Sequence, residues 1–314
     1  MYLLLIAQIV PIFGILGIIY LVLFIYRQYN LRKKSKTPFT ENALLRLPGH
    51  SLDRKIRGMN DELAVNLFAL FLTATIFANI IITTTLIAKK EINFSNFGIH
   101  FIGTGIMIIF FLYRTVKYLL IRQNLRLGYF GELVTAEALN KLMPEGNHVF
   151  HDFQADHFNI DHIVVGPAGV FAIETKARSK AVSGDGKKDA KAIYNGREII
   201  FSNFNDTTYL EQAKRQAKWL STWLKSAIGE PVEVFPIISL PGFYVERRTP
   251  YDGIFVINPK QMKTVIRSKL VKTLDESKIL RIVHQLDQKC RDLEITSKQY
   301  DAKSSPVSGS DNNT

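Results

Sequence analysis

Cysteine is almost absent from this chain, because Cys290 is the only one among 314 residues. A single cysteine excludes an internal disulfide framework and is typical of a protein kept in a reducing compartment, so we interpret Cys290 as a packing residue. A zinc-binding pattern is also missing, since the spacings of His148, His151, His157 and His162 match no standard ligand set. These histidines are expected in loops or on the surface.

Charge is absent from residues 1–26, which are almost entirely apolar. As a helix, this run can span about 30 Å of hydrocarbon. A basic leading region and a small-residue cleavage site, the marks of a cleaved signal peptide, are missing too. Residues 1–26 are therefore predicted to form a transmembrane helix.

Two more long apolar runs follow along the chain. Residues 63–88 contain no charge, and residues 97–121 carry Arg114 and Lys117, whose long side chains can reach the membrane interface. Because a bilayer does not tolerate unpaired backbone groups, each run is expected to cross as a complete helix. The sequence thus predicts three transmembrane helices.

The basic residues predict an orientation. Residues 27–62 are rich in Arg and Lys, whereas the connection after the second run has only Lys89 and Lys90. Basic loops remain in the cytoplasm, so 27–62 is predicted to be a cytoplasmic loop and the amino terminus to lie outside the cell (inner) membrane. The third helix then returns the chain to the cytoplasm. The net charge of +12 is compatible with a polyanionic partner, but much of the excess is juxtamembrane and fits topology determinants or contacts to anionic lipid better than DNA ligands.

Residues 159–176, NIDHIVVGPAGVFAIETK, predict a β-hairpin. The arms, 160–165 and 170–176, are rich in β-branched and apolar residues, and Gly-Pro-Ala-Gly between them is typical of a turn. A connection of this length pairs Val165 with Val170. Counting outward from that pair predicts which side chains share a face.

In that register Asp161 lies opposite Glu174, and Lys176 follows on the same face. Two carboxylates about 5 Å apart repel by on the order of 3 kcal/mol at an effective dielectric constant of about 20. A divalent cation would offset this repulsion, and oxygen ligands suit Mg²⁺ or Mn²⁺ rather than zinc. The alternative is a solvated Asp and Glu on an exposed face, with Lys176 as an ordinary ion-pair partner.

The remaining soluble part predicts an α/β or α+β core. Asn195-Gly196 between two short apolar runs predicts a tight hairpin. The other expected elements are helices at 132–143 and 209–228, strands at 148–153, 232–240 and 253–257, and C-terminal helices at 261–294. Residues 295–314 are expected to be a disordered tail.

Glu132 and Gln212 are candidate site residues with alternative explanations. Gly128 and Gly131 predict a turn that would place Glu132 in the first turn of a helix, where the helix dipole favours a carboxylate. Gln212 and Gln216, four residues apart, share a helical face. From the residues alone, Glu132 is equally a dipole partner, and both glutamines are solvent-facing.

The sequence resembles the nuclease-related domain (NERD), a branch of the PD-(D/E)XK nuclease superfamily. The resemblance covers roughly residues 126–260 and is carried by GYFGE at 128–132, the hairpin NIDHIVVGPAGVFAIETK, and the segments LEQAKRQAKWL and PVEVFPIISL. It implies a restriction-endonuclease-like α/β (α+β) core with a central mixed β-sheet flanked by helices. Here that core would be preceded by three transmembrane helices.

The resemblance also implies a site for phosphodiester hydrolysis. Asp161 and Glu174, with Thr175, would bind Mg²⁺ or Mn²⁺, and a metal held in this way can lower the pKa of a bound water. Lys176 would orient or activate that water. The supporting active-site residues would be Glu132 and Gln212.

A basic stretch follows the hairpin and contains Arg178, Lys180, Lys187 and Lys188. Such a segment could follow a phosphate backbone and so bind nucleic acid. The alternative is a run of solvated charges.

The predicted function is a membrane-anchored, metal-dependent nuclease that hydrolyses DNA on the cytoplasmic side. RNA is a second candidate substrate, and the anchor contacts the lipid bilayer and is a candidate surface for homo-oligomerisation. The alternative function is a catalytically silent nucleic-acid-binding or scaffolding membrane protein that uses the nuclease fold.

Overall fold

The structure is a computed structural model that describes residues 20–22, 24–26, 28, 44–88, 94–180, 189–270 and 274–292. The chain divides into two compact units. Unit 1 comprises residues 1–38 and 57–123, and unit 2 comprises residues 39–56 and 124–314. The first predicted transmembrane helix lies outside the described residues except at 20–22 and 24–26, and the predicted tail lies outside them completely.

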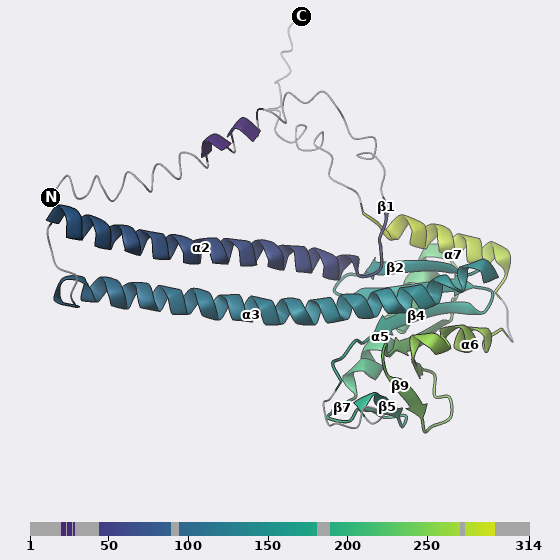
Figure 1. The fold of residues 1–314 in the computed structure, drawn as a ribbon. Coiled ribbons are helices and arrows are strands. Elements are labelled where there is room, and N and C mark those ends of the chain that lie inside the picture. The colour runs from purple at the N-terminus through teal and green to yellow at the C-terminus, as the bar shows by residue number, and fades with distance from the viewer. Residues whose placement is uncertain are drawn as a thin grey trace, which may run out of the picture. The chain divides into compact units, whose positions relative to one another are not determined.

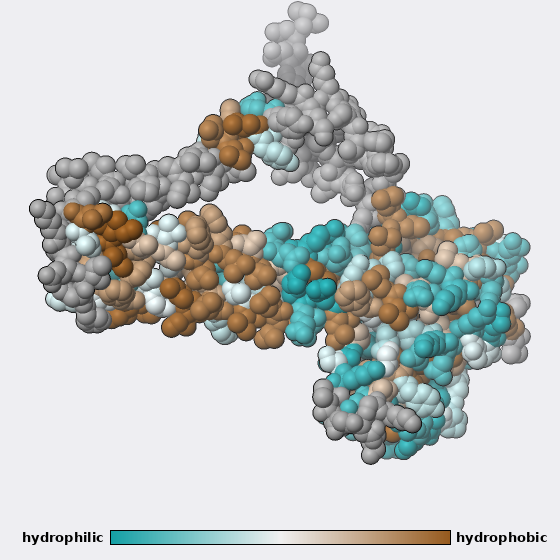
Figure 2. Space-filling model, in the orientation of Figure 1, coloured by the Kyte–Doolittle hydropathy of each residue, from teal (hydrophilic) through white to brown (hydrophobic). Residues whose placement is uncertain are grey.

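Unit 1 contains most of two long helices, α2 (His50–Ala88) and α3 (Phe94–Asn140), which run side by side (Figure 1). The Asn66 amide bridges them, donating to the Phe111 carbonyl at 2.9 Å and contacting the Thr115 hydroxyl at 2.6 Å. Apolar side chains cover much of both helices (Figure 2). By length and composition, His50–Leu86 and Phe97–Glu145 could each cross a membrane.

The helix boundaries differ from the prediction. The runs 63–88 and 97–121 lie inside α2 and α3, but α2 already begins at His50, so the second half of the predicted loop 27–62 is helical. The Pro48-Gly49 turn ends just before that helix, and Asp53 supplies a carboxylate to its first turn. The loop's residues 27 and 29–43 lie outside the described part of the chain.

The turn expected at Gly128 to Gly131 is wrong, because α3 continues through it to Asn140. These glycines serve close packing instead. A β-carbon on Gly131 would lie 2.5 Å from Cβ of Ala177, and one on Gly128 would lie 3.2 Å from Leu52. Glu132 is consequently deep inside a long helix and is not a first-turn dipole partner.

The centre of unit 2 is a mixed five-stranded sheet in the order β10-β8-β4-β3-β2. β2, β3 and β4 are antiparallel neighbours, whereas β4, β8 and β10 run parallel. The pairing of Val165 with Val170 confirms the predicted hairpin register. The strands are β2 (His148–Gln154), β3 (Asn159–Gly166), β4 (Gly169–Thr175), β8 (Val234–Ser239) and β10 (Phe255–Ile257).

Helices cover both faces of this sheet. α5 (Thr208–Ile228) and α7 (Glu276–Lys289) share one core with alternate residues of β3 and β4, including Ile163 and Ala172. The end of α3 and α6 (Met262–Arg267) share the opposite core with the intervening residues, including Val164 and Ile173. The fold is therefore a mixed α/β arrangement, which fits a nuclease-like core.

A second sheet has the order β7-β6-β5-β9. Tyr194 pairs with Ile199 across Asn195-Gly196, which confirms the predicted tight hairpin. Gly196 has a φ of 94°, a conformation that favours glycine. The strands are β5 (Lys191–Tyr194), β6 (Ile199–Ile200), β7 (Asn205–Asp206) and β9 (Tyr244–Arg247).

A short segment before α2 also belongs to unit 2, and we call residues 44–52 the strap. Its strand β1 (Leu44–Leu45) pairs with β11 (Arg291–Asp292), and the Arg46 amide donates to the Cys290 carbonyl at 2.9 Å. Cys290 is buried, and burial raises its pKa to about 12, as expected for a packing residue. Two short 3₁₀ helices, η1 (Met143–Glu145) and η2 (Pro259–Gln261), complete the unit.

Candidate active site

Asp161 and Glu174 are the next residues of β3 and β4 beyond the His162–Ile173 pair, at which the ladder between these strands ends. Both side chains are buried, with exposed fractions of 7% and 4%. Asp161 accepts a hydrogen bond from the Thr175 amide at 2.7 Å. The two carboxylates therefore occupy the interior, and the alternative of a solvated hairpin face does not apply.

Two amides of α5 hold the carboxylate of Glu174. Gln212 donates to Oε1 and Gln216 donates to Oε2, each at 2.7 Å. The glutamines are one helical turn apart, and Leu220 and Leu224 on the same helix pack into the core beside β4. Gln216 is 1% exposed, so the expectation of a solvent-facing residue is wrong for it. The sequence feature that could have indicated a shared role is the spacing of four residues between Gln212 and Gln216, which places both on one face of the helix.

Lys176 follows β4 directly and carries the positive charge of the site. Its Nζ lies 2.6 Å from Oε1 of Glu174 and donates to Gln212 at 3.0 Å. The ammonium group also lies over the ring of Tyr209, 5.0 Å from its centroid. The Lys176 amide donates to the Ser239 carbonyl at 2.9 Å, which fixes the backbone at the end of the strand.

Glu132 reaches the same site from α3. Its side chain is buried, and Oε2 has no hydrogen-bond partner within the described part of the chain. Burial raises its pKa to about 8, and the charges of Asp152 and Glu174 act in the same direction. A hydrogen bond with the Gly49 backbone in the strap partly opposes this shift.

The carboxylates interact electrostatically. Burial raises the pKa of Asp161 well above its usual range, and the charges of Glu174 and Glu132 raise it further, whereas the Thr175 amide and Lys176 lower it. Three carboxyl groups with one lysine form a site whose full ionisation costs free energy. A cation would offset that cost.

The donors suit a hard divalent cation, although no group of three or more His, Cys, Asp or Glu side chains in the described ranges is arranged to hold a metal ion. Carboxylate oxygens are the ligands that Mg²⁺ and Mn²⁺ prefer. Oε2 of Glu132 is buried and has no hydrogen-bond partner in the described structure, so it could serve as a further oxygen acceptor for such a cation. Thr175 follows Glu174 in the chain and donates its amide to Asp161, and its hydroxyl is likewise buried without a partner in the described structure.

The basic residues predicted to bind nucleic acid differ in their surroundings. Arg178 donates to the Tyr209 hydroxyl and stacks on Phe204, 5.2 Å from the ring centroid, so it forms part of the wall beside Lys176. Lys180 is exposed. Lys187 and Lys188 lie outside the described residues.

Three histidines expected in loops or on the surface, His148, His151 and His162, lie in strands β2 and β3 instead. His151 and His162 are cross-strand neighbours, and their Nδ1 atoms are 2.8 Å apart. Burial lowers the pKa of His151 to about 4 and that of His162 well below its usual range. The prediction of loop or surface positions failed for these two residues because it did not foresee that His151 and His162 pair across β2 and β3, with both side chains on the same face of the sheet.

Comparison with protein families agrees with this geometry. Residues 127–241 match the model of the NERD family, the nuclease-related domain. No curated protein and no solved structure matches the chain. The match begins in α3 before Glu132 and ends after β8, so it contains every side chain of the candidate site described above. The chain therefore carries a nuclease-related domain at residues 127–241.

Proposed function

We propose that this protein is a membrane-anchored, metal-dependent nuclease that hydrolyses phosphodiester bonds of DNA on the cytoplasmic side of the membrane. The observation that carries the proposal is the buried pair Asp161 and Glu174 with Lys176 2.6 Å from Glu174, inside the nuclease-related domain. Burying two carboxylates beside one ammonium costs stability, and clusters of this kind occur preferentially at functional sites. Phosphodiester hydrolysis is a function that such a cluster can perform.

Each residue has a defined part in the reaction. Asp161 and Glu174, with Thr175, would hold Mg²⁺ or Mn²⁺, which supplies charge neutralisation and a water of lowered pKa when bound. Lys176 orients the attacking water and stabilises charge on the phosphate. Gln212 and Gln216 fix the Glu174 carboxylate, and Glu132 supports the site from α3.

The anchor belongs to the same proposal. The apolar lengths of α2 and α3 support two crossings, and the charge-free residues 1–26 would supply a third. The basic flanks of these runs favour a cytoplasmic nuclease-related domain and an external amino terminus. A carboxyl-terminal green fluorescent protein fusion should fluoresce in cells, while a matching alkaline phosphatase fusion should be inactive. The reverse pattern would contradict the orientation.

The test of activity uses the full chain in detergent micelles. Supercoiled, linear and single-stranded DNA should be cleaved with Mg²⁺ or Mn²⁺, and EDTA should stop cleavage. Asp161→Asn and Lys176→Met should each lower the rate by at least about 100-fold. Asp156→Asn and Lys218→Met change exposed residues of the same types and should cleave normally.

A folded wild-type protein that cleaves no substrate would overturn the nuclease proposal. DNA binding without cleavage would then favour the catalytically silent binding protein. Equal activity in Asp161→Asn and the wild type would show that cleavage arises elsewhere or from a contaminant.

A further inference from the structure

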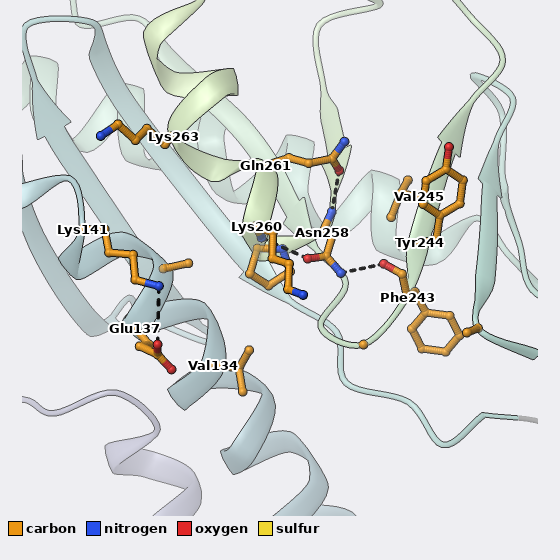
Figure 3. A pocket seen from close by; sticks show the side chains of 14 residues that line it. Val134, Glu137, Lys141, Phe243, Tyr244, Val245, Asn258, Lys260, Gln261 and Lys263 are labelled. Carbon is orange, nitrogen blue, oxygen red and sulfur yellow. Dashed lines mark hydrogen bonds and ion pairs between the residues drawn. The ribbon is translucent and has the colours of Figure 1, made fainter. Parts of the chain in front are cut away.

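A groove of about 910 Å³ lies in unit 2 (Figure 3). One wall is the end of α3 with Val134 and Ala138, and the other walls are the start of β9 and the Asn258 to Lys263 segment. Most of the lining is apolar, which suits the faces of nucleotide bases. Three lysines and one glutamate, Lys141, Lys260, Lys263 and Glu137, are its charged residues.

Buried hydrogen bonds connect the segments that form the groove to the backbone of the candidate site. Thr135, next to Val134, forms a hydroxyl-hydroxyl hydrogen bond of 2.9 Å with Ser239. The Ser239 carbonyl accepts the hydrogen bond from the Lys176 amide, and Gly242 in the groove follows three residues later.

An exposed aromatic ring is presented at one side. Tyr244 is 67% exposed, although its backbone is held by β-pairing with Lys191 and by donation to the Ala190 carbonyl at 2.7 Å. In Figure 3, Tyr244 and Lys141 lie on opposite sides of the segment that carries Asn258 and Lys260. A ring on a fixed backbone can act as a stacking platform, because only its side-chain torsions remain to be ordered on binding.

The charges at the groove favour a polyanion. Lys141 pairs with Glu137 at 3.5 Å, but both side chains are largely exposed, so this ion pair is weak and exchangeable. Lys263 shares Glu145 with Arg267, which leaves an excess of positive charge there. Lys260 is exposed on the groove. Lys180 extends the basic rim, since its Cε lies 3.8 Å from the β-carbon position of Gly242.

The walls are tied together by one side chain. Asn258 donates to the Phe243 carbonyl at 2.7 Å and accepts from the Lys260 amide at 3.0 Å. The backbone amide of Asn258 donates to the side-chain oxygen of Gln261 at 3.0 Å. These hydrogen bonds fix the Asn258 segment to the start of β9, so two of the groove's walls are held together within the protein.

We propose that this groove binds a single-stranded segment of the nucleic-acid substrate. A base stacks on Tyr244, and phosphates contact Lys141 and Lys260. The inference rests on the proposed nuclease function. A duplex does not offer an exposed base face to Tyr244, because its bases are stacked inside, so the preferred substrate has a single-stranded part.

The test measures binding separately from cleavage. A fluorescein-labelled single-stranded oligonucleotide is titrated with the full chain carrying Asp161→Asn, and anisotropy reports the affinity. Adding Tyr244→Ala should weaken binding about 10-fold or more, whereas Tyr244→Phe should retain it because the stacking face remains. Lys260→Ala should reduce the slope of log affinity against log salt by about 0.7, and Lys218→Ala should leave the slope unchanged. Affinity for a blunt duplex should not respond to Tyr244→Ala.

Single-strand binding that is absent, or equal in Tyr244→Ala and its parent, would overturn the groove proposal. If the wild type cleaves DNA but Tyr244→Ala binds single strands as tightly as its parent, the groove proposal is wrong while the nuclease proposal stands. A Tyr244-dependent affinity in a protein that never cleaves DNA would support the groove and contradict the nuclease.

Discussion

Ser51 donates two hydrogen bonds to Asp152, one from its amide and one from its hydroxyl, each 2.9 Å long. Asn159 and Gln154 donate to the same carboxylate at 2.9 and 3.0 Å. Asp152 is fully buried, so these donors replace the water that an ionised carboxylate needs. The strap is thereby fixed to β2, which also places Gly49 beside Glu132.

We expect Asp152→Asn to lower the free energy of unfolding of unit 2 by about 2 kcal/mol, because an amide group cannot accept all of these hydrogen bonds. Asparagine tolerates the positive φ of 49° at this position, so the effect reports the hydrogen bonds and not backbone strain. Trp219 and Trp223 contact Phe153 and provide a fluorescence signal for denaturant unfolding. Asp156→Asn, at an exposed position, should change stability by less than about 0.5 kcal/mol. Equal midpoints in the two variants would refute this role of Asp152.

The raised pKa of Glu132 predicts a pH-dependent stability of the metal-free protein. Between about pH 4.5 and 8 the folded state keeps a proton that the unfolded chain has released, so the free energy of unfolding falls as pH rises. Asp161 acts in the same direction, and the charges of Asp152, Glu174 and Lys176 surround the pair. Glu132→Gln should raise the melting temperature in EDTA at about pH 8, with a much smaller gain at about pH 5. A gain that is the same at both pH values would show that ionisation of Glu132 is not responsible.

Gln216 is expected to act as a positioning residue for Glu174. Gln216→Leu removes the donor to Oε2 without opening a cavity, and the loss of a group that orients a metal ligand costs about 10- to 100-fold in metal affinity or activity. The informative readout is the Mg²⁺ concentration for half-maximal cleavage, which should rise, because a defect in packing alone would not move it. Gln288→Leu, on the exposed side of α7, is the matched control. An unchanged Mg²⁺ dependence in Gln216→Leu would contradict this role.

Gly131→Ala should destabilise the protein by roughly 1–3 kcal/mol, since the added methyl group would lie 2.5 Å from Cβ of Ala177. Gly58→Ala makes the same change in helix α2 at a position with nothing within 4 Å, so it should stabilise by about 0.5–1 kcal/mol. Thermal unfolding of the two variants gives the comparison. Stabilisation by Gly131→Ala would mean that α3 and the end of β4 are not in close contact.

Local rules explain the parts of the fold that were predictable. The hairpin around Pro167 and Ala168 followed from turn chemistry and period-two alternation, and these set the Val165–Val170 register and hence the placement of Asp161 and Glu174. The Asn195-Gly196 hairpin and helix α5 followed in the same way. Each depends on residues close together in the chain, whose preferences can be read without knowing their neighbours in space.

The errors arose where one residue type has two uses. Glycines often mark turns, but Gly128 and Gly131 are in a helix, where Leu52 and Ala177 approach closely and leave little room for a side chain. Glutamines are usually exposed, but Gln216 is buried, because its side-chain amide donates a hydrogen bond to the buried carboxylate of Glu174. Sequence spacing does not distinguish these cases, since the deciding partner is far away in the chain.

The sequence by itself determined the hairpin and its register, the apolar runs, and the pairing of two carboxylates with a lysine, because these follow from turn type and periodicity. Only the tertiary structure decided that Glu132 from α3 and the two glutamines of α5 meet at that pair, that the strap contacts Glu132, and that unit 2 contains a groove. The physical reason is that burial and hydrogen bonding between distant segments arise only when the helices pack on the sheet.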